Sequence, residues 1–282
     1  MYEAHFGLRE RPFSTSPDPR FLFLTAQHQE ALAKCQAVIE SRMGASAIYG
    51  DIGAGKTTIA RRLIDLYSLP AEGGEKNPGY NVAYLVHPTY PTPFQFVRQI
   101  LFEFGLTQPK RSLSDYLTTL QAFLQTEHDK GKINVLIVDE AHKFKPPLLE
   151  VIRQLLNFEG PNAKYLQVAL FGETELATKL DRSPALKDRI ASFGALTSLR
   201  RDDVEALIDF RWKVAGGEKH PFSSEAVDRL YLYSQGLPRR ICKLCDTALI
   251  RAYSTDTKVV GVGHVQTAAE ELRLSQPPLS EN

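Results

Sequence analysis

A run of nine residues constrains this chain more than any other feature: Gly50-Asp51-Ile52-Gly53-Ala54-Gly55-Lys56-Thr57-Thr58. Glycine, four residues, glycine, lysine and a hydroxyl residue follow one another in the order of a phosphate-binding loop, the Walker A pattern. The glycines let the backbone curl so that successive N–H groups point at phosphate oxygens. Lys56 adds a positive charge beside the β- and γ-phosphates, and the Thr57 hydroxyl can bind Mg²⁺. The run therefore predicts a binding site for a nucleoside triphosphate with Mg²⁺.

The sequence around this loop fits the pattern. Residues 45–49 are typical of a short buried strand that enters the loop, and residues 57–67 have apolar side chains at helical spacing. A helix in this place directs the positive end of its dipole at the phosphates. The alternative is a chance glycine turn, and the strand–loop–helix order favours the phosphate loop over it.

A second pattern, of the Walker B kind, indicates hydrolysis. Residues 133–138 form an uncharged, β-branched run typical of the middle strand of a parallel sheet, and Asp139 and Glu140 follow directly. Ligands of open α/β sheets collect at the carboxyl ends of the strands, so these carboxylates are expected beside the phosphate loop. Asp139 would bind Mg²⁺, and Glu140 could act as general base on the attacking water. The alternative is an acidic pair that starts the next helix, and both roles are compatible.

Composition limits the protein class. The chain has 282 residues, 43% hydrophobic and 24% charged, which is typical of a soluble nucleotide-binding core with a smaller appended domain. A net charge of +1 neither requires nor excludes nucleic acid, so contact with DNA would need a local basic patch. No apolar run is long enough to span a membrane and no signal peptide is evident, which predicts a cytoplasmic protein without a membrane partner.

Three cysteines, Cys35, Cys242 and Cys245, are an odd number and suggest a reducing cytosol. Cys242 and Cys245 form a C-x-x-C pair on a strongly helical stretch, with no second pair to complete a zinc site. We therefore expect buried thiols on one helix face.

The order of predicted segments indicates an α/β core. Strands are predicted at residues 45–49, 81–86, 133–138, 165–171 and 194–199, and a helix at 27–41 precedes them. The helices predicted between these strands lie at residues 94–104, 113–128 and 147–157. Alternation of this kind predicts a parallel five-stranded sheet between helices.

After Arg201 only helical patterns occur, at residues 203–215, 224–234, 238–254 and 264–274, and they predict a small all-helical C-terminal domain. The predicted domains are an N-terminal leader and helix (1–44), the α/β core (45–199), the helical domain (200–274) and a disordered tail (275–282). The leader, rich in Pro and Phe up to residue 25, can pack aromatic side chains on a core.

Longer stretches resemble a known family. The phosphate loop, the Asp139-Glu140 strand end and the helical C-terminal domain resemble an AAA+ P-loop ATPase of the initiator-type branch, in which the helical domain is a lid. Segments at residues 5–13, 16–22, 170–176 and 236–241 resemble the ExeA (general secretion pathway protein A) group more narrowly. Transposition regulators of the TnsC, TniB and MuB kind are similar AAA+ ATPases. The resemblance implies ATP as the nucleotide, with Mg²⁺ as cofactor.

The resemblance also implies further contacts with the nucleotide. Glu173 and Thr174 follow the fourth predicted strand, where the family has a polar sensor of the γ-phosphate; a neutral side chain is usual there, which favours Thr174. The alternative for both is a surface turn. Arg239 begins a predicted helix after Pro238 and matches the second sensor, which contacts the nucleotide from the lid, whereas Arg240 is expected to face solvent.

Arg189 matches the family's arginine finger, which enters the site of a neighbouring subunit, and Arg182 is close enough in sequence to compete for this role. The alternative is a solvated helix charge. A finger that acts in trans implies a homo-oligomer, either a ring or an open helical filament, with ATP at each contact between subunits.

Two functions from different classes follow from the resemblance. In one, the protein is a TnsC-like regulator of DNA transposition that assembles on double-stranded target DNA with ATP and recruits a transposase, together with target-selector proteins. In the other, it is an ExeA-like accessory ATPase of type II secretion or envelope assembly. ExeA proteins have a membrane span and a peptidoglycan-binding domain after the ATPase, and this sequence ends with the lid, so the DNA function is the expected one.

DNA contacts are expected from two short basic turns. Lys110 and Arg111 lie between two predicted core helices and, with residues 89–90, could follow a phosphate backbone without reading bases. Lys143 and Lys145 follow Glu140 closely and could connect DNA contact with the catalytic carboxylate. The alternative for each pair is an ordinary solvated turn.

Overall fold

The computed structural model describes residues 1–14, 18–68, 79–161 and 163–274. Their contacts group the chain into two compact units. The sheet unit comprises residues 26–51 and 55–196, and the helical unit comprises the described residues of 1–25, 52–54 and 197–274. The predicted tail, 275–282, lies outside the described residues, and the predicted domain boundaries stay a prediction.

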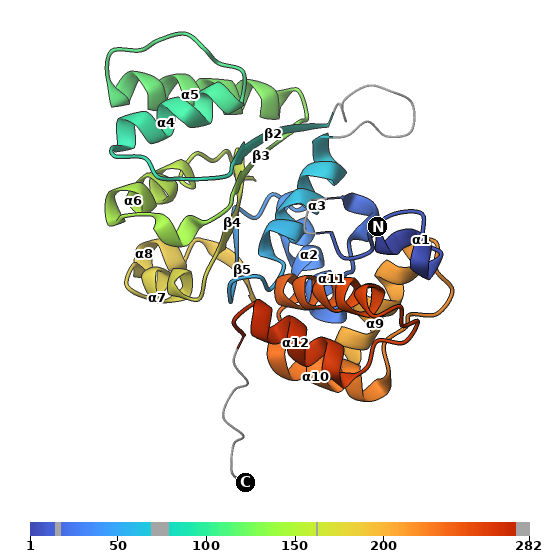
Figure 1. Ribbon diagram of the computed structural model, residues 1–282. Helices are drawn as coiled ribbons and strands as arrows, with labels where there is room; N and C mark the ends of the chain where they lie inside the picture. Colours follow the sequence, from blue (N-terminus) through green and yellow to red (C-terminus); the bar gives the residue numbers. More distant parts are fainter. Residues whose placement is uncertain (15–17, 69–78, 162, 275–282) are drawn as a thin grey trace. The chain divides into compact units, whose positions relative to one another are not determined.

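A parallel sheet of five strands forms the centre of the sheet unit (Figure 1). The strands are β1 (Ala45–Gly50), β2 (Tyr80–Leu85), β3 (Ile133–Val138), β4 (Leu166–Gly172) and β5 (Ile190–Leu196). Their order is β2-β3-β4-β1-β5, and every neighbouring pair is parallel. β4 is buried along its whole length, as expected for an apolar strand in the middle of such a sheet. The predicted α/β fold with a five-stranded parallel sheet is thereby confirmed.

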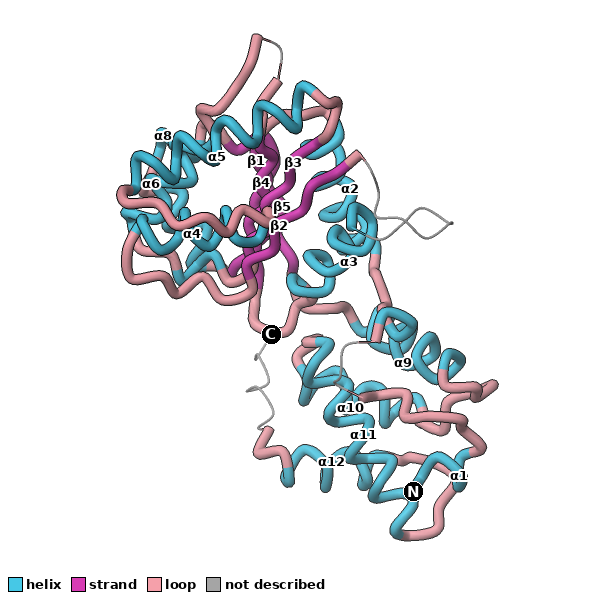
Figure 2. Tube along the Cα trace, turned by 90° about the horizontal axis from the view of Figure 1, so that it is seen from above, coloured by secondary structure: helices cyan, strands magenta, loops and turns pink. Residues whose placement is uncertain are grey.

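Helices cover both faces of this sheet (Figures 1 and 2). One face packs against α2 (Ala26–Glu40) and α3 (Lys56–Ser68), and the other packs against α4 (Pro93–Glu103), α5 (Leu113–Asp129) and α6 (Pro146–Leu155). Two short helices, α7 (Glu175–Asp181) and α8 (Pro184–Lys187), lie between β4 and β5. α4 begins where the Thr92 hydroxyl accepts a hydrogen bond from the Gln95 N–H at 3.3 Å, with Pro93 at the first helical position.

The helical unit contains α9 (Arg201–Val214), α10 (Ser224–Ser234), α11 (Pro238–Ser254) and α12 (Val262–Glu271). Its core also includes aromatic side chains of the N-terminal leader, among them Tyr2, Phe13 and Phe21. The leader forms α1 (Tyr2–Phe6) and a 3₁₀ turn, η1 (Pro19–Phe21). Tyr2 donates a hydrogen bond to Asp246 on α11 at 2.5 Å, and Arg211 on α9 donates to the Phe21 carbonyl at 3.2 Å. The predicted packing of leader aromatics on a core is thereby confirmed, and that core is the helical one.

Cys242 and Cys245 are both buried on α11, as the sequence predicts. Burial raises the pKa of both thiols, so they are poorly reactive side chains of the core. None of the helices in the described ranges is long and apolar enough to cross a membrane.

The last strand differs most from its prediction. β5 runs from Ile190 to Leu196 and not over residues 194–199, because it begins to pair with β1 at Ala45 and an irregularity follows at Ser46. Residues 197–199 leave the sheet, and the Leu199 N–H instead donates to the Gly236 carbonyl at 2.8 Å within the helical unit. The end of this strand is therefore set by its partners and not by its own composition.

Candidate nucleotide-binding site

The phosphate loop joins the end of β1 at Gly50 to the start of α3 at Lys56. Gly55 has a φ of 99°, in the left-handed region that favours glycine. A Cβ atom added to Gly55 would lie 2.5 Å from Nε2 of His28 on α2, so a side chain cannot be placed there without displacing the imidazole. Gly55 is therefore required both by the curvature of the loop and by the helix packed against it.

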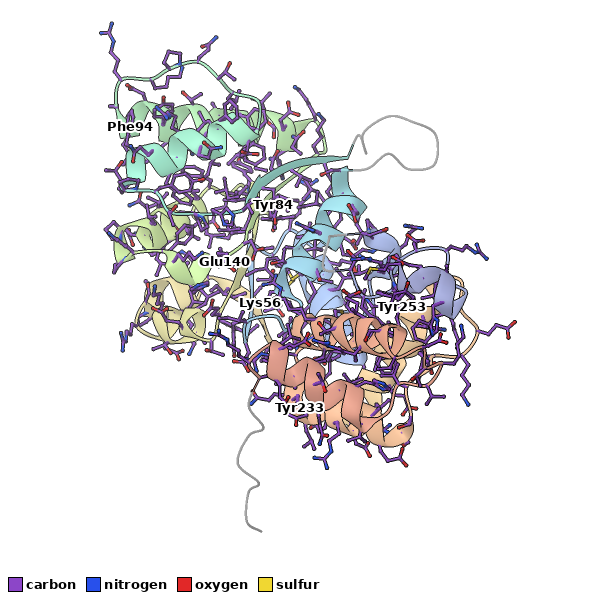
Figure 3. All side chains as sticks on the ribbon, viewed as in Figure 1. Lys56, Tyr84, Phe94, Glu140, Tyr233 and Tyr253 are labelled. Atoms are coloured by element: carbon purple, nitrogen blue, oxygen red, sulfur yellow. The ribbon has the colours of Figure 1, made fainter. Side chains whose placement is uncertain are left out.

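Lys56 is buried, with only 6% of the residue exposed, and its ammonium group closes the loop. Its Nζ donates hydrogen bonds to the carbonyls of Gly50 and Asp51, both at 2.8 Å. Burial lowers the pKa of Lys56, and the negative charges of Glu173 and Glu140 oppose this effect. Figure 3 shows Lys56 at the start of α3 and Glu140 after β3. A buried cation that is held by two loop carbonyls is well placed to exchange these partners for phosphate oxygens.

Thr57 and Asp139 meet across the site, as the two sequence patterns predict. The Thr57 hydroxyl donates a hydrogen bond to Oδ2 of Asp139 at 2.7 Å, while Oδ1 of Asp139 accepts the Glu140 backbone N–H at 2.9 Å. Asp139 is 2% exposed. A hydroxyl and a carboxylate are the hard oxygen ligands that Mg²⁺ prefers, so the residues fit this cation.

Glu140 has an unusual backbone conformation. Its φ of 56° and ψ of 30° lie in the left-handed region, which is uncommon for a residue with a side chain and is frequent at functional sites. Its Oε2 lies 2.9 Å from Nζ of Lys143. Burial alone raises the pKa of Glu140, but the hydrogen bond and charge of Lys143, with the charge of Lys56, oppose it, and the pKa is lowered. Glu140 is therefore held as a carboxylate, the form that a general base needs.

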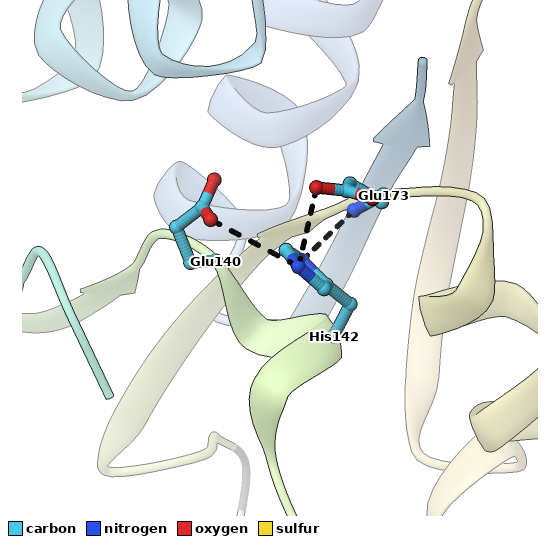
Figure 4. Close-up of side chains that lie close together, drawn as sticks. All are labelled: Glu140, His142 and Glu173. Atoms are coloured by element: carbon cyan, nitrogen blue, oxygen red, sulfur yellow. Dashed lines mark hydrogen bonds and ion pairs between the residues drawn. The ribbon is translucent and has the colours of Figure 1, made fainter. Parts of the chain in front are cut away.

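A histidine that the sequence analysis did not single out joins the site (Figure 4). His142 is 7% exposed, and its Nε2 lies 3.4 Å from Oε1 of Glu173 and 3.9 Å from Oε2 of Glu140. Its Nδ1 accepts a hydrogen bond from the Glu173 backbone N–H at 3.1 Å. The sequence signal for it is a histidine two residues after the candidate general base, Glu140, but only the pairing of β3 with β4 shows which residues it contacts.

The two sensor candidates after β4 differ in their surroundings. Thr174 is exposed, stands at the N-terminus of α7 and makes no capping hydrogen bond with its side chain. Glu173 lies beside His142, and its charge acts on Lys56. The structure thus brings Glu173 to the other carboxylates and leaves Thr174 at the surface, while the role of Thr174 stays a prediction.

Arg239 lies close to the tip of the phosphate loop. Residues 52–54 belong to the helical unit together with α11, and a Cβ atom added to Gly53 would lie 3.4 Å from Cβ of Arg239. Pro238 occupies the first turn of α11 and sets the direction in which the helix begins. Arg240, the expected solvent-facing neighbour, donates to the side chain of Gln235 at 3.1 Å. The role of Arg239 as the second sensor stays a prediction.

The candidates for the arginine finger lie between β4 and β5. Arg189 is half-buried, and its guanidinium donates hydrogen bonds to Oδ1 of Asn157 at 2.8 Å and to the Ala185 carbonyl at 2.6 Å. Arg182 is exposed at the end of α7, and its side chain makes no hydrogen bond or ion pair with any described residue. Arg189 is thus held in a defined orientation and Arg182 projects into solvent.

The basic turns proposed for DNA lie on separate loops. Arg111 is exposed between α4 and α5, and the neighbouring Lys110 backbone N–H donates to the Tyr116 hydroxyl at 3.2 Å. Lys145 is exposed at the N-terminus of α6, whereas Lys143 pairs with Glu140. Only the second turn is directly connected to the candidate catalytic residues.

Comparisons with known proteins agree with this geometry. A family model described as "AAA domain" matches residues 39–180. General secretion pathway protein A of Aeromonas hydrophila is 36% identical over 276 residues, which are 96% of this chain and 48% of that protein. The chain thus spans about half the length of this curated relative.

Solved structures share the fold at low sequence identity. The Cdc6p protein of Pyrobaculum aerophilum has a TM-score of 0.69 at 16% identity, over 92% of this chain and 70% of that one. The ORC2 protein of Aeropyrum pernix, solved in ADPNP–ADP complexes, has a TM-score of 0.65 at 19% identity, over 93% of this chain and 71% of that one. The structure of Drosophila ORC bound to DNA has a TM-score of 0.65 at 20% identity, over 97% of this chain and 66% of that one. This chain therefore belongs to the AAA domain family, among AAA+ ATPases similar to general secretion pathway protein A.

Proposed function

We propose that this protein binds ATP with Mg²⁺ and hydrolyses it, and that the bound nucleotide controls assembly of its subunits on double-stranded DNA. The observation that carries the chemistry is the 2.7 Å contact between the Thr57 hydroxyl and Asp139. It joins the phosphate loop to the carboxyl end of β3, and these two side chains would hold a magnesium ion, which would supply positive charge beside the phosphates.

The residues of the site divide the reaction among them. Lys56 gives up the carbonyls of Gly50 and Asp51 and contacts the phosphates, where its charge stabilises the transition state. Glu140 accepts the proton of the attacking water, whose oxygen bonds to the γ-phosphorus as the bond from that phosphorus to the bridging oxygen of ADP breaks. Mg²⁺, when bound by Thr57 and Asp139, neutralises part of the phosphate charge.

Arg189 is proposed to complete the site of the adjacent subunit. Its guanidinium is already oriented by Asn157 and Ala185, which reduces the entropy lost when it contacts a phosphoryl group. An arginine supplied from the adjacent subunit makes hydrolysis depend on a head-to-tail homo-oligomer, either a ring or a helical filament.

Arg189→Ala is expected to lower kcat by about 10³–10⁵ while each subunit still binds nucleotide, because the finger acts on the transition state of its neighbour. Turnover should return in part when this variant is mixed with Lys56→Ala protein. In a random equal mixture about a quarter of the contacts pair an intact pocket with an intact finger. Phosphate release measured over a series of mixing ratios checks this, with Arg182→Ala as the matched control. Recovery absent at every ratio would contradict action in trans.

The proposed role of the assembly is that of a TnsC-like transposition regulator, which marks double-stranded DNA and recruits a transposase and target-selector proteins. Exposed Arg111 and Lys145 support it, since basic side chains on loops contact phosphates without reading sequence. A second candidate, an ExeA-like accessory ATPase of secretion or envelope assembly, is favoured by the 36% identity to general secretion pathway protein A.

The two candidates differ in DNA binding. With a non-hydrolysable ATP analogue, a transposition regulator is expected to form filaments or rings on double-stranded DNA of any sequence, and ADP should disfavour them. Binding should weaken steeply with salt because counterions are released. The double variant Lys110→Ala/Arg111→Ala should reduce the salt slope by about 1 for each lost phosphate contact. Electron microscopy and fluorescence anisotropy measure these effects.

The matched control is Lys213→Ala/Lys219→Ala, which removes the same charge from exposed positions of the helical unit and should leave DNA binding unchanged. Hydrolysis of ATP without DNA association at low salt, in the presence of any nucleotide, would exclude the transposition role. The ExeA-like function would then take its place.

A further inference from the structure

Two turns at the carboxyl ends of neighbouring strands are joined directly. One follows β3 and includes Glu140, and the other follows β4 and includes Glu173. The Glu173 N–H donates to Nδ1 of His142 at 3.1 Å. Lys179, one turn further along α7, donates to the carbonyls of His142 and Phe144, the latter at 3.2 Å. The position of Glu140 is thus coupled to that of the residues after β4.

The close approach of these turns depends on Gly172, the last residue of β4. A Cβ atom added there would lie 3.0 Å from the backbone nitrogen of His142 and 2.9 Å from Cβ of Leu176. Backbone atoms cannot move aside as the end of a flexible side chain can. The two turns are therefore so close that only a glycine, which has no Cβ, fits at position 172. This close packing fixes the backbone of His142, and the backbone in turn fixes the position of the His142 ring.

The hydrogen bond from Glu173 assigns the proton on the His142 ring. In a neutral imidazole one nitrogen accepts and the other donates. Since Nδ1 accepts the Glu173 N–H, Nε2 carries the proton. That N–H lies beside two carboxylates, 3.4 Å from Oε1 of Glu173 and 3.9 Å from Oε2 of Glu140 (Figure 4).

The same three side chains are close enough to hold a metal ion. A metal at Nε2 would need the lone pair of that nitrogen, with the ring proton on Nδ1 and donated to an acceptor. Here Nδ1 of His142 instead faces a backbone N–H donor. The arrangement therefore fits a neutral ring whose Nε2–H lies near two anions better than it fits a metal ligand.

We propose that His142 is a positioning residue for ATP hydrolysis, which places the carboxylate of Glu140 by holding that of Glu173 beside it. This inference rests on the proposed ATPase function. Two carboxylates this near repel each other, and the Nε2–H between them offsets the repulsion. Without this donor, Glu140 would move toward Lys143, its partner at 2.9 Å, and away from the attacking water. His142 acts through Glu173 and Glu140 and does not touch the substrate.

Three substitutions of His142 distinguish the role of the donor, Nε2, from that of the acceptor, Nδ1. In His142→Gln the amide nitrogen can stand near Nε2, so the donor is kept and the acceptor is lost. In His142→Asn the amide oxygen can stand near Nδ1, so the acceptor is kept and the donor is lost. His142→Ala lacks both. The measurements are kcat and KM for ATP, the affinity for a non-hydrolysable ATP analogue, and the midpoint of thermal unfolding.

We expect His142→Asn and His142→Ala to lower kcat by about ten- to hundredfold with KM and analogue affinity unchanged, since a displaced base costs rate and not binding. His142→Gln should keep most of the wild-type kcat. The midpoint of thermal unfolding should depend on the acceptor, Nδ1. It should stay near wild type in His142→Asn and should be lower in His142→Gln and His142→Ala, where the Glu173 N–H loses its acceptor.

A His142→Asn protein that folds normally and retains the wild-type kcat would overturn the proposal, because the Nε2 donor would then have no part in hydrolysis. Rates that follow thermal stability across the three variants would overturn it as well, because they would reduce His142 to a structural contact. These outcomes are distinct from a failure of the ATPase function, in which the wild-type protein itself would not hydrolyse ATP.

Discussion

Replacing Lys56 by alanine is expected to weaken ATP binding by at least about 100-fold, because a charge-assisted hydrogen bond is worth ~1.5–3 kcal/mol and this ammonium would contact two phosphates. Titration with a fluorescent ATP analogue measures the loss. Lys34→Ala is the matched control, since Lys34 belongs to the same unit but pairs with Glu30 on an outer helix face. Equal affinities for Lys56→Ala and wild type would show that the loop does not bind the triphosphate as proposed.

The same substitution separates binding from folding. Lys56 also satisfies the carbonyls of Gly50 and Asp51, so its removal leaves these two acceptors to water. The thermal midpoint without nucleotide reports this effect alone. A loss of affinity accompanied by a nearly unchanged midpoint assigns the effect to the phosphates.

Glu140→Gln is expected to lower kcat by about 10²–10⁴, because the attacking water loses its general base. ATP affinity should remain close to wild type, since the substitution keeps the size of the side chain and removes a negative charge from the site. Single-turnover phosphate release together with analogue binding distinguishes the two effects. Glu150→Gln, at an exposed residue paired with Arg153, is the matched control.

Turnover at the wild-type rate in Glu140→Gln would remove Glu140 as the base. Glu173 would then be the remaining carboxylate beside His142, and its charge already acts on Lys56. The double variant Glu140→Gln/Glu173→Gln would decide between these residues.

Local patterns predict the central site well. The phosphate loop and the strand ending at Asp139 each depend on a few adjacent residues, and both motifs recur because phosphate and Mg²⁺ impose the same geometry. The meeting of Thr57 with Asp139 follows once both segments belong to one parallel sheet. Strands β2 and β4 also lie within a residue or two of their predicted ranges, since their apolar runs are bounded by polar turns.

Features that depend on neighbours in space could not be predicted in this way. The range of β5 is set by its register with β1, and its sequence alternates buried and exposed residues without a clear boundary. His142 joins the site only because β3 lies beside β4, and this strand order cannot be predicted from the local sequence patterns. The choice between Glu173 and Thr174 depends on how the turn leaves β4, and one residue of difference reverses which side chain faces inward.

The path of the N-terminal leader has a consequence for biosynthesis. Tyr2 is bonded to Asp246, which lies 244 residues later in the chain. At about 5–20 residues per second, a ribosome makes Asp246 roughly ten to fifty seconds after Tyr2. Throughout that interval the aromatic side chains of the leader have no helical core to enter, while the sheet unit can fold as it emerges. The helical unit therefore forms after the sheet unit, and the leader remains accessible to chaperones until the helices on which it packs have been translated.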